Sequence, residues 1–104
     1  MIVEERIYTL HPGKVPEYLR HYENEGLAIQ QPILGRLIGY FSTEFGTLNQ
    51  IIHLWGYDSL EERAKRRAVL LADAGWRSYV AKVQPLIRTM ENKLLVPTAF
   101  SPIR

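Results

Sequence analysis

The hydrophobic positions of the first third of the chain change period once, at a turn. Residues 2–10 are rich in β-forming residues and end at His11-Pro12-Gly13, a turn that a strand cannot cross. From Lys14 onward, apolar residues recur at three- and four-residue spacing, which is typical of one face of a helix. Pro16 suits the first turn of that helix, and Pro32 is expected to close it. The pattern therefore predicts a strand followed by a helix.

Two further β-rich runs, Leu37–Thr43 and Gln50–Tyr57, flank a short Gly-containing connection over 44–49. Runs joined in this way pair as an antiparallel hairpin. A second helix is expected to begin directly after the hairpin, because Asp58 with Glu61, or Ser59 with Glu62, provides a capping residue followed three positions later by a carboxylate.

The second helix is predicted to be broken near its middle. Its first part places apolar residues on one face, residues 73–75 (Asp-Ala-Gly) interrupt it, and a second apolar stripe follows. The first stripe consists of Leu60, Ala64, Ala68 and Leu71, and the second of Trp76, Tyr79, Val80 and Val83. Residues 87–96 return to a strand pattern that Pro97 ends, and a short tail follows over 98–104.

The order of elements is β-α-β-β-α-β, with no internal repeat and no linker-like segment. Handedness rules for crossover connections turn this order into a four-stranded antiparallel sheet with both helices on one face. The predicted fold class is therefore α+β and ferredoxin-like, with residues 1–104 forming one domain.

Alternation along the strands separates two sets of side chains. The aliphatic set, with Val3, Ile7, Ile52 and Leu54, is expected to face the helices. The other set is aromatic and polar and is assigned to the uncovered face, where it is too apolar to be left in water. A second copy laid face to face would cover it, so we expect a homodimer that forms a dimeric α/β barrel. The residues expected in the ligand pocket or dimer interior are Arg6, Tyr8, Tyr40, Ser42, His53, Trp55, Tyr57, Met90 and Asn92.

Composition narrows the possible chemistry. The 104 residues include no cysteine, which excludes a disulfide framework, a thiolate zinc site and a cysteine nucleophile. The formal charge of +2 makes nucleic acid an unfavoured partner. No apolar run approaches the roughly 20 residues that span a bilayer, and the first residues do not resemble a signal peptide. A cytoplasmic protein is therefore expected.

The aromatic and polar set has two interpretations. In one, Arg6 binds a carboxylate, His53 donates or accepts protons, and the rings stack on an anionic or aromatic ligand. In the other, the same residues form a satisfied network at the dimer interface. Glu44 and Glu91 are possible general bases but are expected to be solvated or ion-paired. The basic run 63–67 is expected to be the solvated face of the second helix.

No metal and no cofactor is expected. His11 lies in a turn and His21 on a helix, and neither forms a ligand pattern with His53. The spacing of the glycines also matches no phosphate-binding loop or dinucleotide fingerprint.

Several ordered blocks of the chain resemble the NIPSNAP family. They are Arg6–Lys14, Gly39–Gln50, His53–Arg63, Trp76, and Glu91-Asn92 before Pro97. The resemblance covers nearly the whole chain and implies membership of the dimeric α/β-barrel superfamily. It brings no established reaction, and the links of larger eukaryotic members to mitochondria, vesicle traffic and mitophagy are not carried over to this chain. The wider superfamily includes cofactor-independent monooxygenases, lactone isomerases, haem-using enzymes and stress-response proteins, so the fold does not select a chemistry.

Two functions follow as hypotheses. The first is a small homodimeric binding or interaction module. The second is a metal-independent enzyme, resembling a monooxygenase, isomerase or lyase, that acts on a small hydrophobic or aromatic metabolite inside the barrel. In the second, Arg6 would orient the substrate and His53 would move protons.

Overall fold

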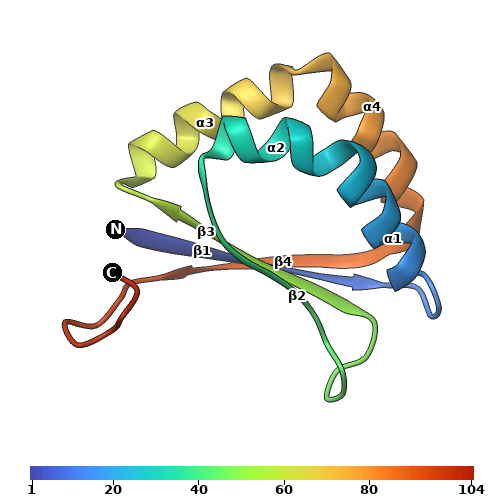
Figure 1. The fold of residues 1–104 in the computed structure, drawn as a ribbon, viewed down its shortest axis with the longest axis horizontal. Coiled ribbons are helices and arrows are strands. Elements are labelled where there is room, and N and C mark those ends of the chain that lie inside the picture. The colour runs from blue at the N-terminus through green and yellow to red at the C-terminus, as the bar shows by residue number, and fades with distance from the viewer.

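The computed structural model describes residues 1–104 and confirms the ferredoxin-like fold. One antiparallel sheet contains β1 (Ile2–Leu10), β2 (Arg36–Ser42), β3 (Gln50–Tyr57) and β4 (Ile87–Leu95). The strand order is β2-β3-β1-β4, so the two central strands are β1 and β3. All helices lie over one face of the sheet, and the other face carries no helix (Figure 1).

The first helical segment is longer than expected and changes type along its length. It consists of α1 (Val15–His21), a π-helical turn η1 (Tyr22–Gly26) and α2 (Leu27–Leu34). The expectation that Pro32 closes the segment is wrong, because Pro32 lies inside α2. Gly35 ends the helix instead: its φ of 95° suits glycine, and its N–H donates to the carbonyl of Gln31 at 2.8 Å.

The break in the second helical segment is confirmed. The chain forms α3 (Leu60–Ala72), α4 (Ala74–Val83) and a short 3₁₀ turn η2 (Gln84–Leu86). Of the two possible caps, Ser59 caps α3 and accepts a hydrogen bond from the N–H of Glu62 at 3.1 Å. Asp73 makes the break, because its backbone is extended and its carboxylate caps α4.

The assignment of the two side-chain sets to the two faces of the sheet is wrong. The aromatic and polar set faces the helices of the same chain, as the packing of Trp55 with Leu70 of α3 shows. The aliphatic set, with Ile52 and Leu54, lies on the uncovered face. Alternation separates the two sets but does not say which set the helices cover. The helices decide this, because their inner surfaces carry tyrosines and arginines that match rings and polar groups on the sheet.

The orientation of α3 differs from expectation for the same reason. Leu60 and Leu71 of the expected apolar stripe are exposed, whereas Leu70 is fully buried. The basic run is not simply a solvated face, since Arg63 reaches the buried carboxylate of Glu4 on β1. Charge clusters on helices are usually solvated, but a buried partner on the sheet reverses that preference here.

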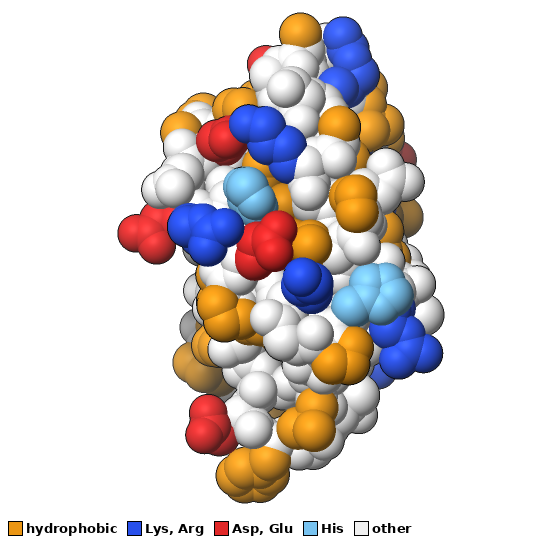
Figure 2. Space-filling model, turned by 90° about the vertical axis from the view of Figure 1, so that its right-hand side faces the viewer, with side chains coloured by type: hydrophobic (Ala, Val, Ile, Leu, Met, Phe, Trp, Pro, Cys, Tyr) orange, Lys and Arg blue, Asp and Glu red, His pale blue; other side chains and the backbone are white.

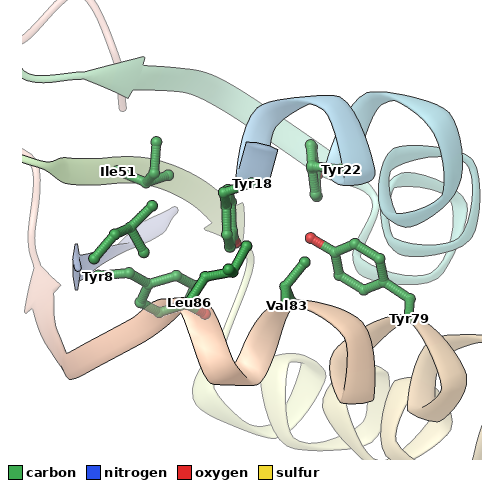
Figure 3. Packing of buried hydrophobic residues seen from close by; sticks show 8 residues of the cluster. Tyr8, Tyr18, Tyr22, Ile51, Tyr79, Val83 and Leu86 are labelled. Atoms are coloured by element: carbon green, nitrogen blue, oxygen red, sulfur yellow. The ribbon is translucent and has the colours of Figure 1, made fainter. Parts of the chain in front are cut away.

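The core consists of two clusters, one at each end of the space between sheet and helices. In the larger cluster, side chains from β1, β3, α1, η1, α4 and η2 converge between the two layers (Figure 3). This cluster contains Tyr8, Leu10, Tyr18, Tyr22, Ile51, Tyr79, Val83 and Leu86. The smaller cluster contains Leu34, Trp55, Tyr57 and Leu70. Four of the eight buried residues of the larger cluster are tyrosines, so this core contains hydroxyl groups that need partners.

Hydrophobic side chains are also exposed outside the core. On the face shown in Figure 2, charged side chains of both signs are interspersed over the middle and hydrophobic ones gather at the lower end. Figure 1 places the β2–β3 hairpin at that end, where Phe45 and Leu48 are exposed. None of the helices is both long and apolar enough to cross a bilayer.

Candidate functional site: an internal cavity beside a buried ionic network

A cavity of about 180 Å³ lies between the sheet and the helices. Nine of its twelve lining residues are hydrophobic. The sheet contributes Tyr8, Tyr40, His53, Ile87 and Met90, and α4 contributes Trp76, Tyr79, Val80 and Val83. An apolar cavity of about 150 Å³ is large enough to hold benzene, so this cavity has room for a single-ring compound.

His53 is the most informative polar group in the cavity wall. Its side chain is 1% exposed, stacks on Tyr40 at a ring distance of 4.6 Å, and accepts a hydrogen bond at Nδ1 from the indole N–H of Trp55 at 2.7 Å. Because Nδ1 is an acceptor, the neutral imidazole carries its proton on Nε2. Nε2 is buried and has no hydrogen-bond partner in the protein. His53 therefore carries a buried N–H donor without a partner, and its side chain forms part of the cavity wall.

The protonation state of His53 supports the same assignment. Burial lowers the pKa of its imidazole to about 3, and the positive charge of Arg6 acts in the same direction. His53 is consequently neutral at physiological pH, and its basic nitrogen is already occupied by Trp55. The geometry suits hydrogen-bond donation rather than proton abstraction.

Three tyrosines of the cavity wall, and Tyr22 stacked behind Tyr40, are also held in their neutral form. Burial raises the pKa of Tyr18 to about 12, and it raises the pKa of Tyr22, Tyr40 and Tyr79 well above the ordinary value. The hydroxyls of Tyr18 and Tyr40 lie 3.2 Å apart and share a hydrogen bond. The hydroxyl of Tyr79 is buried without a partner, so it is a second polar group available to a bound molecule.

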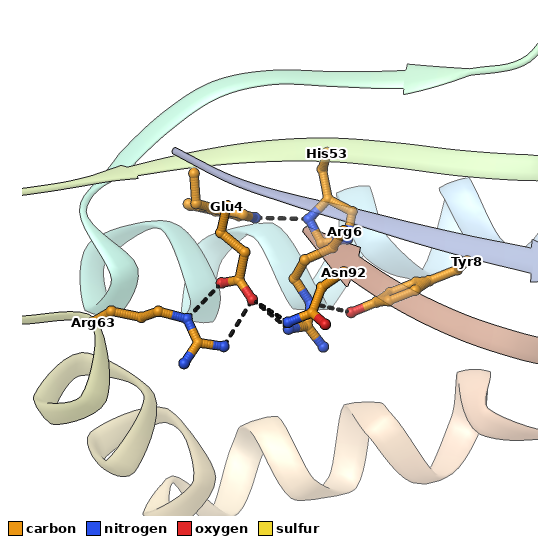
Figure 4. A network of polar contacts seen from close by, with 7 residues as sticks. Glu4, Arg6, Tyr8, His53, Arg63 and Asn92 are labelled. Carbon is orange, nitrogen blue, oxygen red and sulfur yellow. Dashed lines mark hydrogen bonds and ion pairs between the residues drawn. The ribbon is translucent and has the colours of Figure 1, made fainter. Parts of the chain in front are cut away.

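A buried ionic network lies next to the cavity and is centred on Glu4 (Figure 4). The carboxylate of Glu4 accepts two hydrogen bonds from Arg63, at 3.0 and 2.7 Å. It also accepts one from Arg6 at 3.0 Å and one from Asn92 at 2.8 Å. Arg6 donates a further hydrogen bond from Nε to the hydroxyl of Tyr8 at 2.8 Å, which joins the network to the cavity wall.

The network keeps Glu4 ionised although the residue is only 2% exposed. Burial alone would raise the pKa of this carboxyl, but hydrogen bonds from Arg63 and Asn92 and the charge of Arg6 outweigh it and lower the pKa to about 2. A buried carboxylate is stable only when its oxygens are paired, and here the two oxygens share four donated hydrogen bonds.

The residues predicted from the sequence are distributed over three places. Tyr8, Tyr40, His53 and Met90 line the cavity, and Arg6 and Asn92 belong to the ionic network. Trp55 and Tyr57 pack in the smaller core cluster, and Ser42 is exposed at the end of β2. These residues lie on the helix-facing side of the sheet, so their assignment to the uncovered face, and with it to the interior of a dimer, is wrong.

Several residues of the site were missed in the sequence. Glu4 stands two positions before Arg6 and therefore shares its face of β1, which was the available signal. Arg63 and Arg67 were hidden in a basic run that looked like a solvated surface. Tyr18 and Gln30 were missed because nothing in a helical stripe says which of its members border a cavity.

The other candidate residues lie away from the site. Glu44 and Glu91 are exposed, as expected for solvated carboxylates, and His11 is exposed in the turn after β1. His21 lies 3.8 Å from Glu17, one turn earlier on α1. No group of three or more potential ligands is arranged to hold a metal ion.

Comparison with known proteins places this chain in a family. The NIPSNAP family model matches residues 3–102, nearly the whole chain. The chain belongs to the NIPSNAP family. A protein NipSnap homolog of Dictyostelium discoideum is 36% identical over 94 residues, which cover 90% of this chain and 41% of that protein. Protein NipSnap of Drosophila melanogaster is 36% identical, covering 97% of this chain and 36% of that protein. The chain thus spans about two fifths of the length of these relatives.

Solved structures of family members agree closely with this fold. An uncharacterized NIPSNAP-like domain protein from Burkholderia xenovorans is 60% identical, with a TM-score of 0.95, covering 97% of this chain and 88% of that one. A NIPSNAP family protein of unknown function from Agrobacterium tumefaciens is 46% identical, with a TM-score of 0.98, covering 100% and 94% of the two chains. The family relationship therefore defines the fold and leaves the biochemical function uncharacterised.

A more distant likeness extends the fold beyond the family. A putative antibiotic biosynthesis monooxygenase from Nitrosomonas europaea superimposes with a TM-score of 0.66 at 10% identity, over 93% of this chain and 98% of that one. At this identity the likeness concerns the fold alone.

Proposed function

We propose that this NIPSNAP domain is a binding module whose internal cavity holds a small aromatic or apolar molecule. The observation that carries the proposal is the cavity of about 180 Å³ with the unpartnered Nε2 of His53 buried in its wall. Buried polar groups in proteins are nearly always hydrogen-bonded, so a bound molecule with an acceptor would satisfy this one. The rings of Tyr8, Tyr40 and Trp76 would contact its apolar body.

The pKa values favour binding over general acid–base catalysis, which was the alternative hypothesis for Arg6 and His53. A catalytic acid or base works best when its pKa lies near the working pH. In the cavity wall, the pKa of His53 is lowered to about 3 and that of Tyr18 is raised to about 12. An enzyme built on this cavity would have to act through hydrogen bonding and orientation of its substrate.

The test uses neutral single-ring compounds, phenol and benzamide, with saturation-transfer NMR and thermal shift. Met90 lines the cavity and is partly exposed, so the larger ring in Met90→Trp would narrow the cavity at that point. This variant is expected to abolish both the saturation-transfer signal and the thermal shift. Leu94→Trp is the matched control, because Leu94 lies on the same face of β4, is similarly exposed and does not line the cavity. Binding that is equal in both variants, or absent from the unmodified protein, would contradict the proposal.

We also propose that two copies pair through the uncovered face of the sheet. Apolar side chains from all four strands lie there, and the tail adds Ile103, which borders a groove with Val3 and Leu54. Phe41 on β2 is 54% exposed, and burying such a surface is the main driving force for association. The proposed homodimer therefore buries the aliphatic side chains of this face, whereas the aromatic and polar set is already covered by the helices of its own chain.

Analytical ultracentrifugation at micromolar concentration tests the pairing. The unmodified protein is expected to sediment as two chains and Leu54→Asp as one. Val69→Asp, which changes an exposed position on α3, is expected to remain paired. A single-chain mass for the unmodified protein would refute this interface.

A further inference from the structure

The polar atoms of the cavity wall differ in what they can offer to a bound molecule. Four of the lining residues are tyrosines, and a hydroxyl can turn its hydrogen to donate or to accept. The hydroxyls of Tyr18 and Tyr40 already share a hydrogen bond, and that of Tyr8 accepts one from Arg6. His53 is different, because the unpartnered nitrogen of its neutral ring can only donate. Its N–H therefore sets the requirement that a ligand has to meet.

The contacts of the His53 ring direct its Nε2–H toward the cavity. Nδ1 faces the indole of Trp55, which packs in the smaller core cluster and does not line the cavity. The two nitrogens of an imidazole point in nearly opposite directions, so Nε2 is turned away from Trp55. The ring itself packs against Tyr8 and Tyr40, which both belong to the cavity wall. The part of His53 that borders the cavity is therefore the side that carries Nε2.

No charged side chain lines the cavity. Its twelve lining residues include no aspartate, glutamate, lysine or arginine. Arg6, which is opposite His53 in the sheet, already donates to Glu4 and to Tyr8. A charged ligand group would find no opposite charge in the wall, and burying an unpaired charge costs far more than burying a neutral polar group. The cavity wall therefore favours a neutral ligand over a carboxylate or an amine.

We propose that His53 donates a hydrogen bond from Nε2 to a carbonyl oxygen of the molecule in the cavity, so that the ligands are neutral single-ring carbonyl compounds: aryl ketones, aldehydes or amides. The inference rests on the proposed function for the location of the ligand. A carbonyl oxygen accepts hydrogen bonds and has no hydrogen to donate, so it matches a nitrogen that only donates. The attached ring would pack against the aromatic side chains of Tyr40 and Trp76.

The experiment uses three single-ring compounds of nearly the same shape. Acetophenone carries a carbonyl group, cumene has no polar atom, and benzoate carries a negative charge. Affinities are measured by NMR titration at pH 7.5. Water solvates cumene poorly, which favours its binding to any apolar site, so the ratio of the acetophenone affinity to the cumene affinity is compared between variants.

His53→Phe keeps a ring in the cavity wall but removes the donor, and it is expected to lower this ratio at least fivefold. His21→Phe is the matched control, because His21 lies on α1 and does not line the cavity. It is expected to leave the ratio within twofold of that of the unmodified protein. Benzoate is expected to bind the unmodified protein at least tenfold more weakly than acetophenone.

The unmodified protein provides a second measurement of the same hydrogen bond. In nitrogen-correlated NMR, the proton on Nε2 of His53 is expected to shift downfield when acetophenone binds and to shift less than half as far with cumene. This measurement decides if His53→Phe does not fold, since that variant leaves the indole N–H of Trp55 without its acceptor.

The outcomes separate this inference from the proposed function. The ligand class is overturned by a ratio that falls less than fivefold in folded His53→Phe, by a cumene shift of at least half the acetophenone shift, or by benzoate binding within tenfold of acetophenone binding. Each of these results leaves the cavity as a binding site for apolar molecules. Failure of the unmodified protein to bind any of the three compounds overturns the proposed function as well.

Discussion

Glu4→Gln is the substitution that most directly probes the buried ionic network. Glutamine keeps the shape of the side chain but removes the negative charge that faces Arg6, Arg63 and Arg67. The carboxyl of Glu4 has its pKa lowered from 4.5 to about 2, a difference worth about 3 kcal/mol of folding free energy at about 1.4 kcal/mol per unit. Removing one partner of a buried ion pair costs a similar amount, about 3–5 kcal/mol. We therefore expect Glu4→Gln to lower the free energy of unfolding by about 3 kcal/mol at pH 7.

The pH dependence gives this prediction a sign that can be checked. Because the pKa of Glu4 is lower in the folded protein, its contribution is fully present above pH 4.5 and is lost as the pH falls from 4.5 towards 2. Urea denaturation of the unmodified protein should show this loss, and Glu4→Gln should not show it. Glu5→Gln is the control, since this neighbouring side chain points to the opposite face of β1. A loss below about 1 kcal/mol at pH 7, or an unchanged pH profile between 4.5 and 2, would refute the reasoning.

Three further predictions concern separate parts of the structure. His53 should remain in the neutral Nε2–H form down to pH 5 in nitrogen-correlated NMR. The unmodified protein should lose stability as the pH falls from 6.5 towards 3, and His53→Asn should lose less over the same range. Gly26→Ala should cost about 1–3 kcal/mol by urea denaturation, because the added methyl would lie 2.7 Å from the ring of Tyr79, whereas Gly75→Ala meets only looser contacts at 3.2 Å and should cost less. Ser59→Ala should cost about 1 kcal/mol through loss of the cap on α3, with a matching drop in the thermal midpoint.

The end of β1 and the start of α3 were predictable because local chemistry determines them. The turn at Pro12-Gly13 ends β1, and Ser59 begins α3, whatever the rest of the chain does. The end of α2 was misplaced because a proline in the last turn of a helix removes only one backbone donor, and Gly35 is the residue whose backbone reverses the chain.

The faces of the sheet were not predictable in the same way. Alternation grouped Arg6 and His53 correctly, but their position under the helices depends on which side chains α3 and α4 present to the sheet. Arg63 and Arg67 lie on the sheet-facing side of α3. Runs of charged residues on a helix are usually exposed to solvent, so the sequence pattern assigns these two arginines to the solvent-facing side. The cavity is the space left unfilled between side chains from several helices and strands, so no single segment of the sequence indicates it.

The proposed function requires that the ligand binds in the cavity rather than on the uncovered face of the sheet. Nitrogen-15 NMR titration with benzamide distinguishes the two surfaces directly. The indole N–H of Trp76 reports on the cavity, and the backbone amide of Ile52 on β3 reports on a residue whose side chain points to the uncovered face. We expect saturable shifts for Trp76 and its neighbours in the cavity wall, with Ile52 unchanged. Shifts confined to residues on the uncovered face, or no saturable shift at Trp76, would contradict binding in the cavity.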